Sequence, residues 1–204
     1  MCKSMKKSNL IVHRVNSIEI LNSIDSALGC EIDIRTDGSK LILNHNPFKK
    51  GDNLVDYLDE YHHGTLVLNI KETGIETIVL EEVQKRNIKS YFLLDVEMPY
   101  LIKAFTKNEK NLAVRFSEYE PIENVLIFKN RFNWVWVDSV TKVPITKENF
   151  QIINKFNICV VCPSLWKRSE DINKEKYKLS KYNFDNLKVI TKHKHIDMWL
   201  DSFS

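Results

Sequence analysis

The chain has 204 residues, of which 43% are hydrophobic and 28% charged, with 30 Lys and Arg against 27 Asp and Glu. This composition is typical of a globular protein with a sizeable core, and we expect one domain over residues 1–204. The formal net charge of +3 is too small to indicate a partner such as nucleic acid. The sequence has no apolar stretch of about 18 residues and no signal-peptide core, so we expect no membrane span and a cytoplasmic location.

Eight short, apolar, β-branched runs recur along the chain. Such runs are typical of strands that are buried on both faces of a parallel sheet. They are Leu10–Val15, Cys30–Thr36, Leu66–Lys71, Tyr91–Val96, Leu112–Phe116, Trp134–Val140, Ile158–Cys162 and Leu187–Thr191. The connections include three segments with helical periodicity, namely Ser17–Leu28, Thr73–Arg86 and Thr146–Phe156. Strands alternating with helices in this number predict an α/β fold, a compact (β/α)₈ TIM barrel.

Polar side chains stand at the ends of three extended segments in the first quarter of the chain. They are His13 and Arg14 late in the first run, Glu31 and Asp33 within the second, and His45 after the extended segment 41–43. Because alternate residues of a strand share one face, both carboxylates are expected on the same side. Two histidines, two carboxylates and an arginine are suited to metal-assisted chemistry on a phosphate ester.

Five elements in this order resemble the motifs of the glycerophosphodiester phosphodiesterase family, within the phosphatidylinositol-specific phospholipase C-like superfamily. They are His13-Arg14, Glu31-Ile32-Asp33, Asp37-Gly38 with Leu41–Asn44, His45-Asn46-Pro47, and Leu68–Lys71. The resemblance covers roughly the first third of the chain, and the remainder matches as a pattern of strands. It implies a short, divergent phosphoric diester hydrolase that acts on a small-molecule or glycan-linked phosphodiester.

The resemblance also implies a role for each residue. His13 and His45 would be the general acid and base, since histidine titrates near neutrality. Glu31, Asp33 and Asn69 would bind a divalent metal, Mg²⁺ or Ca²⁺, through hard oxygen atoms. Arg14 and Lys71 would contact the phosphate, where cations stabilise growing negative charge. Independently of the resemblance, the positions of Arg115 and Asp138 at the ends of later strands leave two alternatives open, contact with the substrate or pairing with each other.

The chain departs from the family pattern at three positions. Val15 replaces the glycine that usually follows His-Arg, and Asn46 replaces an aspartate that supports the second histidine. Asn69 stands where the family usually supplies a third acidic metal ligand. The small domain that the family often inserts between the second and third strands is missing. The two asparagines leave an alternative open, namely a catalytically silent barrel that binds phosphodiesters in a regulatory or binding role.

A CxxC pattern at Cys159 and Cys162, with His193 and His195 further on, has two interpretations. The four residues could form a zinc site, or the cysteines could be buried in a strand. A single CxxC without a partner pair at the usual spacing favours the buried strand.

Overall fold

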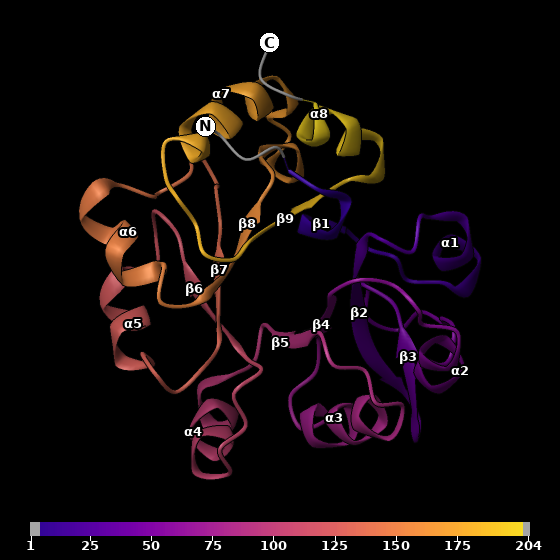
Figure 1. The fold of residues 1–204 in the computed structure, drawn as a ribbon. Coiled ribbons are helices and arrows are strands. Elements are labelled where there is room, and N and C mark those ends of the chain that lie inside the picture. Colours follow the sequence, from indigo (N-terminus) through magenta and orange to yellow (C-terminus); the bar gives the residue numbers. More distant parts are fainter. Residues whose placement is uncertain (1–4, 202–204) are drawn as a thin grey trace. The chain divides into compact units, whose positions relative to one another are not determined.

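The computed structural model describes residues 5–201, which divide into two compact units. The first, called here the 11–112 unit, is continuous in sequence. The second, called the 113–201 unit, also includes residues 5–10. All eight predicted runs contain a strand (Figure 1). The short first strand begins at Leu10 and is counted here with the 11–112 unit, so each unit has four of these strands.

Parallel strands form the sheet of the 11–112 unit. They are β1 (Leu10–Val12), β2 (Gly29–Asp37), β4 (Leu66–Ile70) and β5 (Tyr91–Leu94), in the order β5-β4-β2-β1. A further strand, β3 (Lys40–Leu43), pairs antiparallel with the end of β2. Gly38, with a φ of 61°, lies in the turn between them, where a residue without a Cβ is favoured. Strand β3 therefore carries the chain back along β2 and leads directly to His45.

Three helices connect these strands, namely α1 (Ile18–Ser23), α2 (Leu54–Asp59) and α3 (Glu76–Lys85), and a fourth, α4 (Met98–Thr106), follows β5. Helix α1 begins where the sequence predicts, because the Ser17 hydroxyl accepts a hydrogen bond from the Ile20 N–H. It ends earlier than the predicted Ser17–Leu28, since the Asp25 carboxylate accepts from the Ala27 N–H and holds a turn there. Helix α3 starts later than predicted, because Gly74 has a φ of 100°, outside the helical region.

The 113–201 unit has the parallel order β9-β8-β7-β6. Its strands are β6 (Ala113–Phe116), β7 (Trp134–Val137), β8 (Asn157–Val161) and β9 (Leu187–Thr191). Its helices are α5 (Ile122–Ile127), α6 (Lys147–Ile153), α7 (Ile172–Ser180) and α8 (Ile196–Leu200). Short 3₁₀ turns occupy Lys7–Asn9, Pro163–Trp166, Ser169–Asp171 and His193–His195. Helix α6 is capped by Thr146, as its sequence predicts.

The cysteines of the CxxC pattern are fully buried, Cys159 within β8 and Cys162 directly after it. Within residues 5–201, no group of three or more His, Cys, Asp or Glu side chains could hold a metal ion. The burial of Cys159 inside β8 confirms the interpretation of the pattern as part of a buried strand, with Cys162 one residue past its end.

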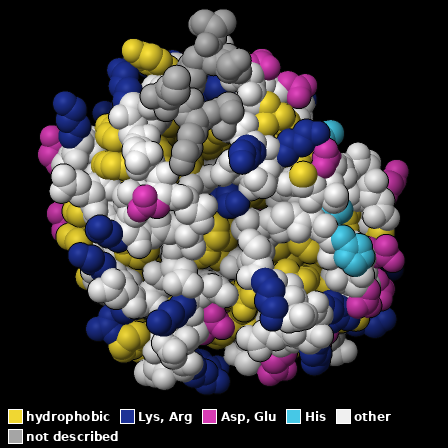
Figure 2. Space-filling model, viewed as in Figure 1, with side chains coloured by type: hydrophobic (Ala, Val, Ile, Leu, Met, Phe, Trp, Pro, Cys, Tyr) yellow, Lys and Arg dark blue, Asp and Glu magenta, His cyan; other side chains and the backbone are white. Residues whose placement is uncertain are grey.

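The described part of the chain has no helix that is long and apolar enough to cross a membrane. On the face drawn in Figure 2, basic and acidic side chains are interspersed among polar ones. This mixed surface is consistent with the small net charge of +3.

Candidate active site

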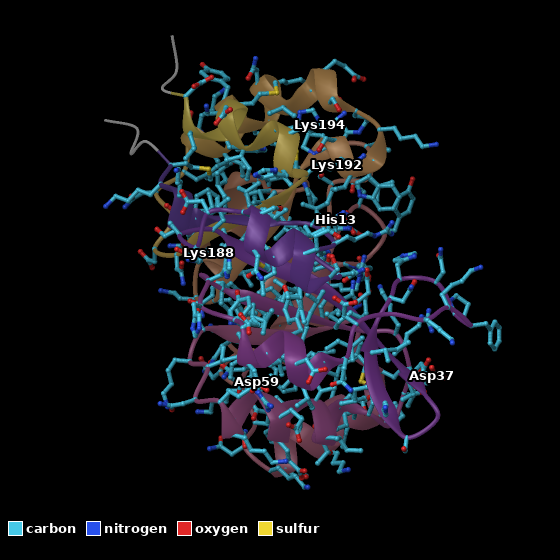
Figure 3. The ribbon with its side chains drawn as sticks, turned by 90° about the vertical axis from the view of Figure 1, so that its right-hand side faces the viewer. His13, Asp37, Asp59, Lys188, Lys192 and Lys194 are labelled. Carbon is cyan, nitrogen blue, oxygen red and sulfur yellow. The ribbon has the colours of Figure 1, made fainter. Side chains whose placement is uncertain are left out.

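The two carboxylates of β2 lie on one buried face of the 11–112 unit. Glu31 and Asp33 are each only 1% exposed, although carboxylates are rarely buried without partners. Their backbones pair with β4 so that Asp33 lies opposite Asn69. The strand alternation therefore brings the predicted carboxylates and Asn69 together. In Figure 3, His13 and Asp37 lie toward the same side of this unit, whereas Asp59, at the end of α2, lies toward the other side.

Both oxygens of Glu31 are held by N–H donors. Asn69 donates from Nδ2 to Glu31 Oε1 over 2.9 Å, and the backbone N–H of Arg14 donates to Glu31 Oε2 over 2.7 Å. His13 Nε2 also lies 3.9 Å from Glu31 Oε2. Glu31 thus joins residues that follow β1 to a residue of β4, and it brings His13 to the edge of the carboxylate pair.

Asp33 is held by a neighbour that the sequence did not reveal. Asn16 donates from Nδ2 to Asp33 Oδ2, and Asn16 Oδ1 accepts from the Asp33 backbone N–H, each over 2.8 Å. The two cations predicted to bind phosphate flank the same carboxylate. Lys71 Nζ lies 3.3 Å from Asp33 Oδ1, and Arg14 Nε lies 3.8 Å from Asp33 Oδ2. Its place directly after the predicted run Leu10–Val15 was the one signal for Asn16 in the sequence.

The electrostatics of the carboxylate pair favour a bound positive charge. Burial, and then repulsion from the Asp33 carboxylate, raise the pKa of Glu31 to about 7. The hydrogen bonds from Asn69 and from the Arg14 backbone, and the charge of Lys71, act in the opposite direction and are outweighed. A cation beside both carboxylates would favour their ionised forms.

The backbone after β1 is turned sharply to reach Glu31. Arg14 adopts a φ of 60°, the left-handed region that is costly for a residue with a Cβ. Its neighbour Val15 is fully buried and donates its N–H to the Glu31 carbonyl oxygen over 2.8 Å. The residue in the left-handed conformation is therefore Arg14, while Val15, at the usual glycine position, packs into the core.

His45 is linked to the other residues through Arg35. Arg35 donates from Nε to the His45 carbonyl and from Nη1 to the Lys71 carbonyl, both over 3.2 Å. The half-buried His45 ring pairs through Nδ1 with Asn46 Oδ1 at 3.1 Å. An amide oxygen only accepts, so Nδ1 of His45 is the donor in this contact. Asn46 thus supplies the oxygen that an aspartate would supply, without its charge.

The donor set fits a hard divalent cation. Asp33 Oδ1 and Asn69 Oδ1 are buried oxygens without a hydrogen-bond partner in the described chain, although Asp33 Oδ1 forms the ion pair with Lys71. Unsatisfied buried oxygens are uncommon and call for an explanation such as an ion. Together with the carboxylate of Glu31 they provide oxygen ligands of the type that Mg²⁺ and Ca²⁺ bind. With two carboxylates and one amide, the set carries less charge than three carboxylates.

The two later candidates belong to the 113–201 unit and pair with each other. Arg115 donates from Nη2 to Asp138 Oδ2 and from Nε to Glu120 Oε1, each over 2.8 Å. Trp166 Nε1 donates to Asp138 Oδ1 over 2.5 Å. Of the two sequence alternatives for Arg115 and Asp138, the structure has the ion pair.

No family model and no curated protein sequence matches the chain. Solved structures resemble it in fold. A glycerophosphodiester phosphodiesterase from Agrobacterium tumefaciens has a TM-score of 0.63 at 9% identity, covering 95% of this chain and 99% of its own. A glycerophosphoryl diester phosphodiesterase from Parabacteroides distasonis has a TM-score of 0.59 at 12% identity, and the match covers 88% of this chain and 81% of that enzyme's chain. Identities this low show the fold alone, and the likeness confirms the predicted (β/α)₈ fold class.

Proposed function

We propose that this protein is a phosphoric diester hydrolase of the glycerophosphodiester phosphodiesterase kind, acting on a small-molecule or glycan-linked phosphodiester with Mg²⁺ or Ca²⁺. One observation carries the proposal. The buried pair Glu31 and Asp33 contacts His13, Arg14, Asn69 and Lys71, on a fold shared with solved phosphodiesterases. Burying carboxylates among cations and an imidazole costs folding stability. Such clusters of buried ionisable groups are typical of catalytic sites.

Glu31, Asp33 and Asn69 Oδ1 would hold the metal. When bound, the cation supplies Lewis-acid polarisation of a phosphoryl oxygen and offsets the charge of the two carboxylates. Arg14 and Lys71, which lie 3.8 and 3.3 Å from Asp33, would orient the phosphodiester anion beside them. Their charges oppose the negative charge that develops on the phosphoryl oxygens as the bond breaks.

The histidines differ in environment, which suggests a division of roles. Nε2 of His45 would accept the proton of the attacking hydroxyl, because Nδ1–H is engaged with Asn46 Oδ1. His13, 3.9 Å from Glu31 Oε2, would donate a proton to the leaving alkoxide. The attacking hydroxyl belongs to water or to a neighbouring carbon of the substrate, and both routes use the same two proton transfers.

Kinetics on bis(4-nitrophenyl) phosphate test this proposal. We expect His13→Ala and His45→Ala each to lower kcat by about 10²–10⁴-fold, the usual contribution of a positioned acid or base. His62→Ala is the matched control, because His62 is an exposed histidine three residues beyond the end of α2. Wild-type turnover that survives both site substitutions would exclude the assigned roles.

The alternative function is a catalytically silent barrel that binds phosphodiesters. Asn69 favours it, because this side chain donates its amide N–H to Glu31 and adds no third carboxylate. Calorimetry with a phosphodiester, run beside the kinetic assay, separates the two. Binding that depends on Lys71 without any turnover in Mg²⁺ or Ca²⁺ would support the silent barrel.

A further inference from the structure

A pocket of about 90 Å³ opens next to Lys71, where β4 and β5 end. Four acidic side chains line it together with Lys71 and Thr73, namely Glu72, Glu76, Asp95 and Glu97. All of them belong to the 11–112 unit. The pocket therefore shares one residue, Lys71, with the proposed phosphate site.

Two of the four acids are already matched by donors or cations. Glu72 Oε2 accepts hydrogen bonds from the backbone N–H and hydroxyl of Thr36, and its Oε1 lies 3.5 Å from Arg35 Nη1. Asp95 Oδ2 lies 3.4 Å from Lys71 Nζ. The charge of Lys71 is shared between Asp95 and Asp33, so it is not available to the remaining acids.

The other two acids have no counter-charge. Glu76 is 1% exposed, and its Oε2 accepts from the Gly74 N–H over 2.8 Å. Its Oε1 is buried and has no partner among the described residues. Glu97 is exposed at the start of α4 and forms no ion pair within residues 5–201. A buried carboxylate oxygen without a donor is costly, so a ligand that brings a donor and a positive charge to it would gain affinity.

We infer that Glu76 and Glu97 form a subsite for a primary ammonium group carried by one alcohol of the phosphodiester. The inference rests on the proposed function, since it places the phosphate at Lys71 and the ammonium in the adjoining pocket. An N–H donor is required because Glu76 Oε1 lacks one, which disfavours a quaternary ammonium. The pocket has room for a short aminoalkyl group.

In this proposal the specificity for the substrate depends on Glu76 and Glu97, which lie outside the motif that resembles the phosphodiesterase family. The anionic phosphate and the cationic amine of one ligand would each meet opposite charge, Lys71 on one side and Glu76 with Glu97 on the other. A neutral hydroxyl could also donate to Glu76 Oε1, but it would leave both carboxylate charges unmatched. Charge, rather than shape, is therefore the property to test.

Calorimetry with two isosteric probes tests the inference without needing turnover. O-phosphoethanolamine carries the ammonium, and n-propyl phosphate replaces it with a methyl group. In Mg²⁺-containing buffer we expect the wild type to bind O-phosphoethanolamine about tenfold more tightly, the scale of one charge-assisted hydrogen bond. In Glu76→Gln the ratio of the two affinities should fall close to one, because the amide offers the ammonium an N–H in place of a carboxylate oxygen. In Glu97→Gln it should fall about threefold, since an exposed charge contributes less.

Glu60→Gln is the matched control, because it removes an exposed acid at the end of α2, outside the pocket, and should keep the wild-type ratio. Equal affinities in the wild type, or no binding of O-phosphoethanolamine, would overturn the inference. So would a preference that survives in both pocket variants. If Glu76→Gln does not fold, the ratio in Glu97→Gln decides. Failure to hydrolyse bis(4-nitrophenyl) phosphate would count against the proposed function alone, since the affinity ratio is measured independently of turnover.

Discussion

At the scale of single residues, the surroundings of Glu31 are the most informative about the candidate site. It is almost completely buried, it accepts hydrogen bonds from two different segments, and it stands two residues from a second buried carboxylate. In the absence of a cation these features oppose one another, because burial and Asp33 disfavour the charge that the donors favour. An ionised Glu31 in these surroundings therefore costs stability unless a cation offsets its charge, and that cost is measurable.

The pH dependence of stability should reveal this cost. The pKa of Glu31 is raised from 4.5 to about 7 in the folded protein, so its contribution to stability is greatest below pH 4.5 and is lost as the pH rises through 7. In metal-free protein, Glu31→Gln should remove this loss, worth about 3 kcal/mol between those limits. Urea unfolding of both proteins at pH 4.5, 6 and 8 measures the difference. A constant difference across that range would show that Glu31 ionises normally. Mg²⁺ at pH 8 should stabilise the wild type and not the variant.

Replacing Asn69 with aspartate should raise the affinity for metal and lower the stability of the protein without metal. Asn69→Asp replaces the amide that donates to Glu31 Oε1 with a third carboxylate of the same size. We expect Mg²⁺ affinity to rise about tenfold, because an anionic oxygen replaces a neutral one, while metal-free stability at pH 8 falls by about 1–3 kcal/mol. Calorimetry and urea unfolding measure the two effects. Asn183→Asp, an exposed change of the same charge outside any helix or strand, should alter neither. Unchanged Mg²⁺ affinity in Asn69→Asp would mean that this side chain does not face the metal.

At the scale of elements, Arg35 holds together two loops that carry proposed site residues. It stands near the end of β2, and its guanidinium reaches the carbonyls of His45, after β3, and of Lys71, after β4. The side chain is only 15% exposed. A planar guanidinium can donate to two acceptors at once in fixed directions, which a lysine ammonium does less well. The hairpin of β2 and β3 therefore positions His45 through a residue that lies outside the family-like motif.

Replacing Arg35 should impair turnover through positioning. Arg35→Met leaves two carbonyls without their donor, and we expect a loss of about 1–3 kcal/mol in the free energy of unfolding. We also expect kcat on an aryl phosphodiester to fall more than KM rises, because a misplaced base slows the chemical step. Arg35→Lys should recover stability better than kcat, since it restores the charge but not both fixed hydrogen bonds. Equal loss of kcat and of stability in both variants would indicate a purely structural residue.

The elements themselves follow from local sequence to different degrees. The strands were predictable because burial on both faces requires continuous apolar runs such as Leu66–Ile70. The starts of α1 and α6 were also predictable from their capping residues Ser17 and Thr146. The end of α1 and the start of α3 were not, because they depend on the turn residues Asp25 and Gly74 inside otherwise periodic segments. The short strand β3 was recognisable as an extended segment, and its pairing with β2 follows from the turn at Gly38.

At the scale of the whole molecule, the candidate site was predictable where its residues share a short motif. Glu31 and Asp33 alternate on one strand, so their common face could be deduced, and the register of β2 with β4 adds Asn69. Asn16, Arg35 and Glu76 could not be deduced, because their roles depend on contacts or burial that only the folded chain creates. The pairing of Arg115 with Asp138 depended on the register of β6 and β7 in the same way.

The most direct test of the proposed function is the metal dependence of phosphodiester hydrolysis. Protein stripped with a chelator should not hydrolyse bis(4-nitrophenyl) phosphate, and titration with Mg²⁺ or Ca²⁺ should restore turnover in the wild type. Asp33→Asn should need far more metal or remain inactive, because it removes one of the two carboxylates that would hold the cation. Equal rates with and without metal, or no hydrolysis at any concentration of either cation, would contradict the assignment of this protein as a metal-dependent phosphodiesterase.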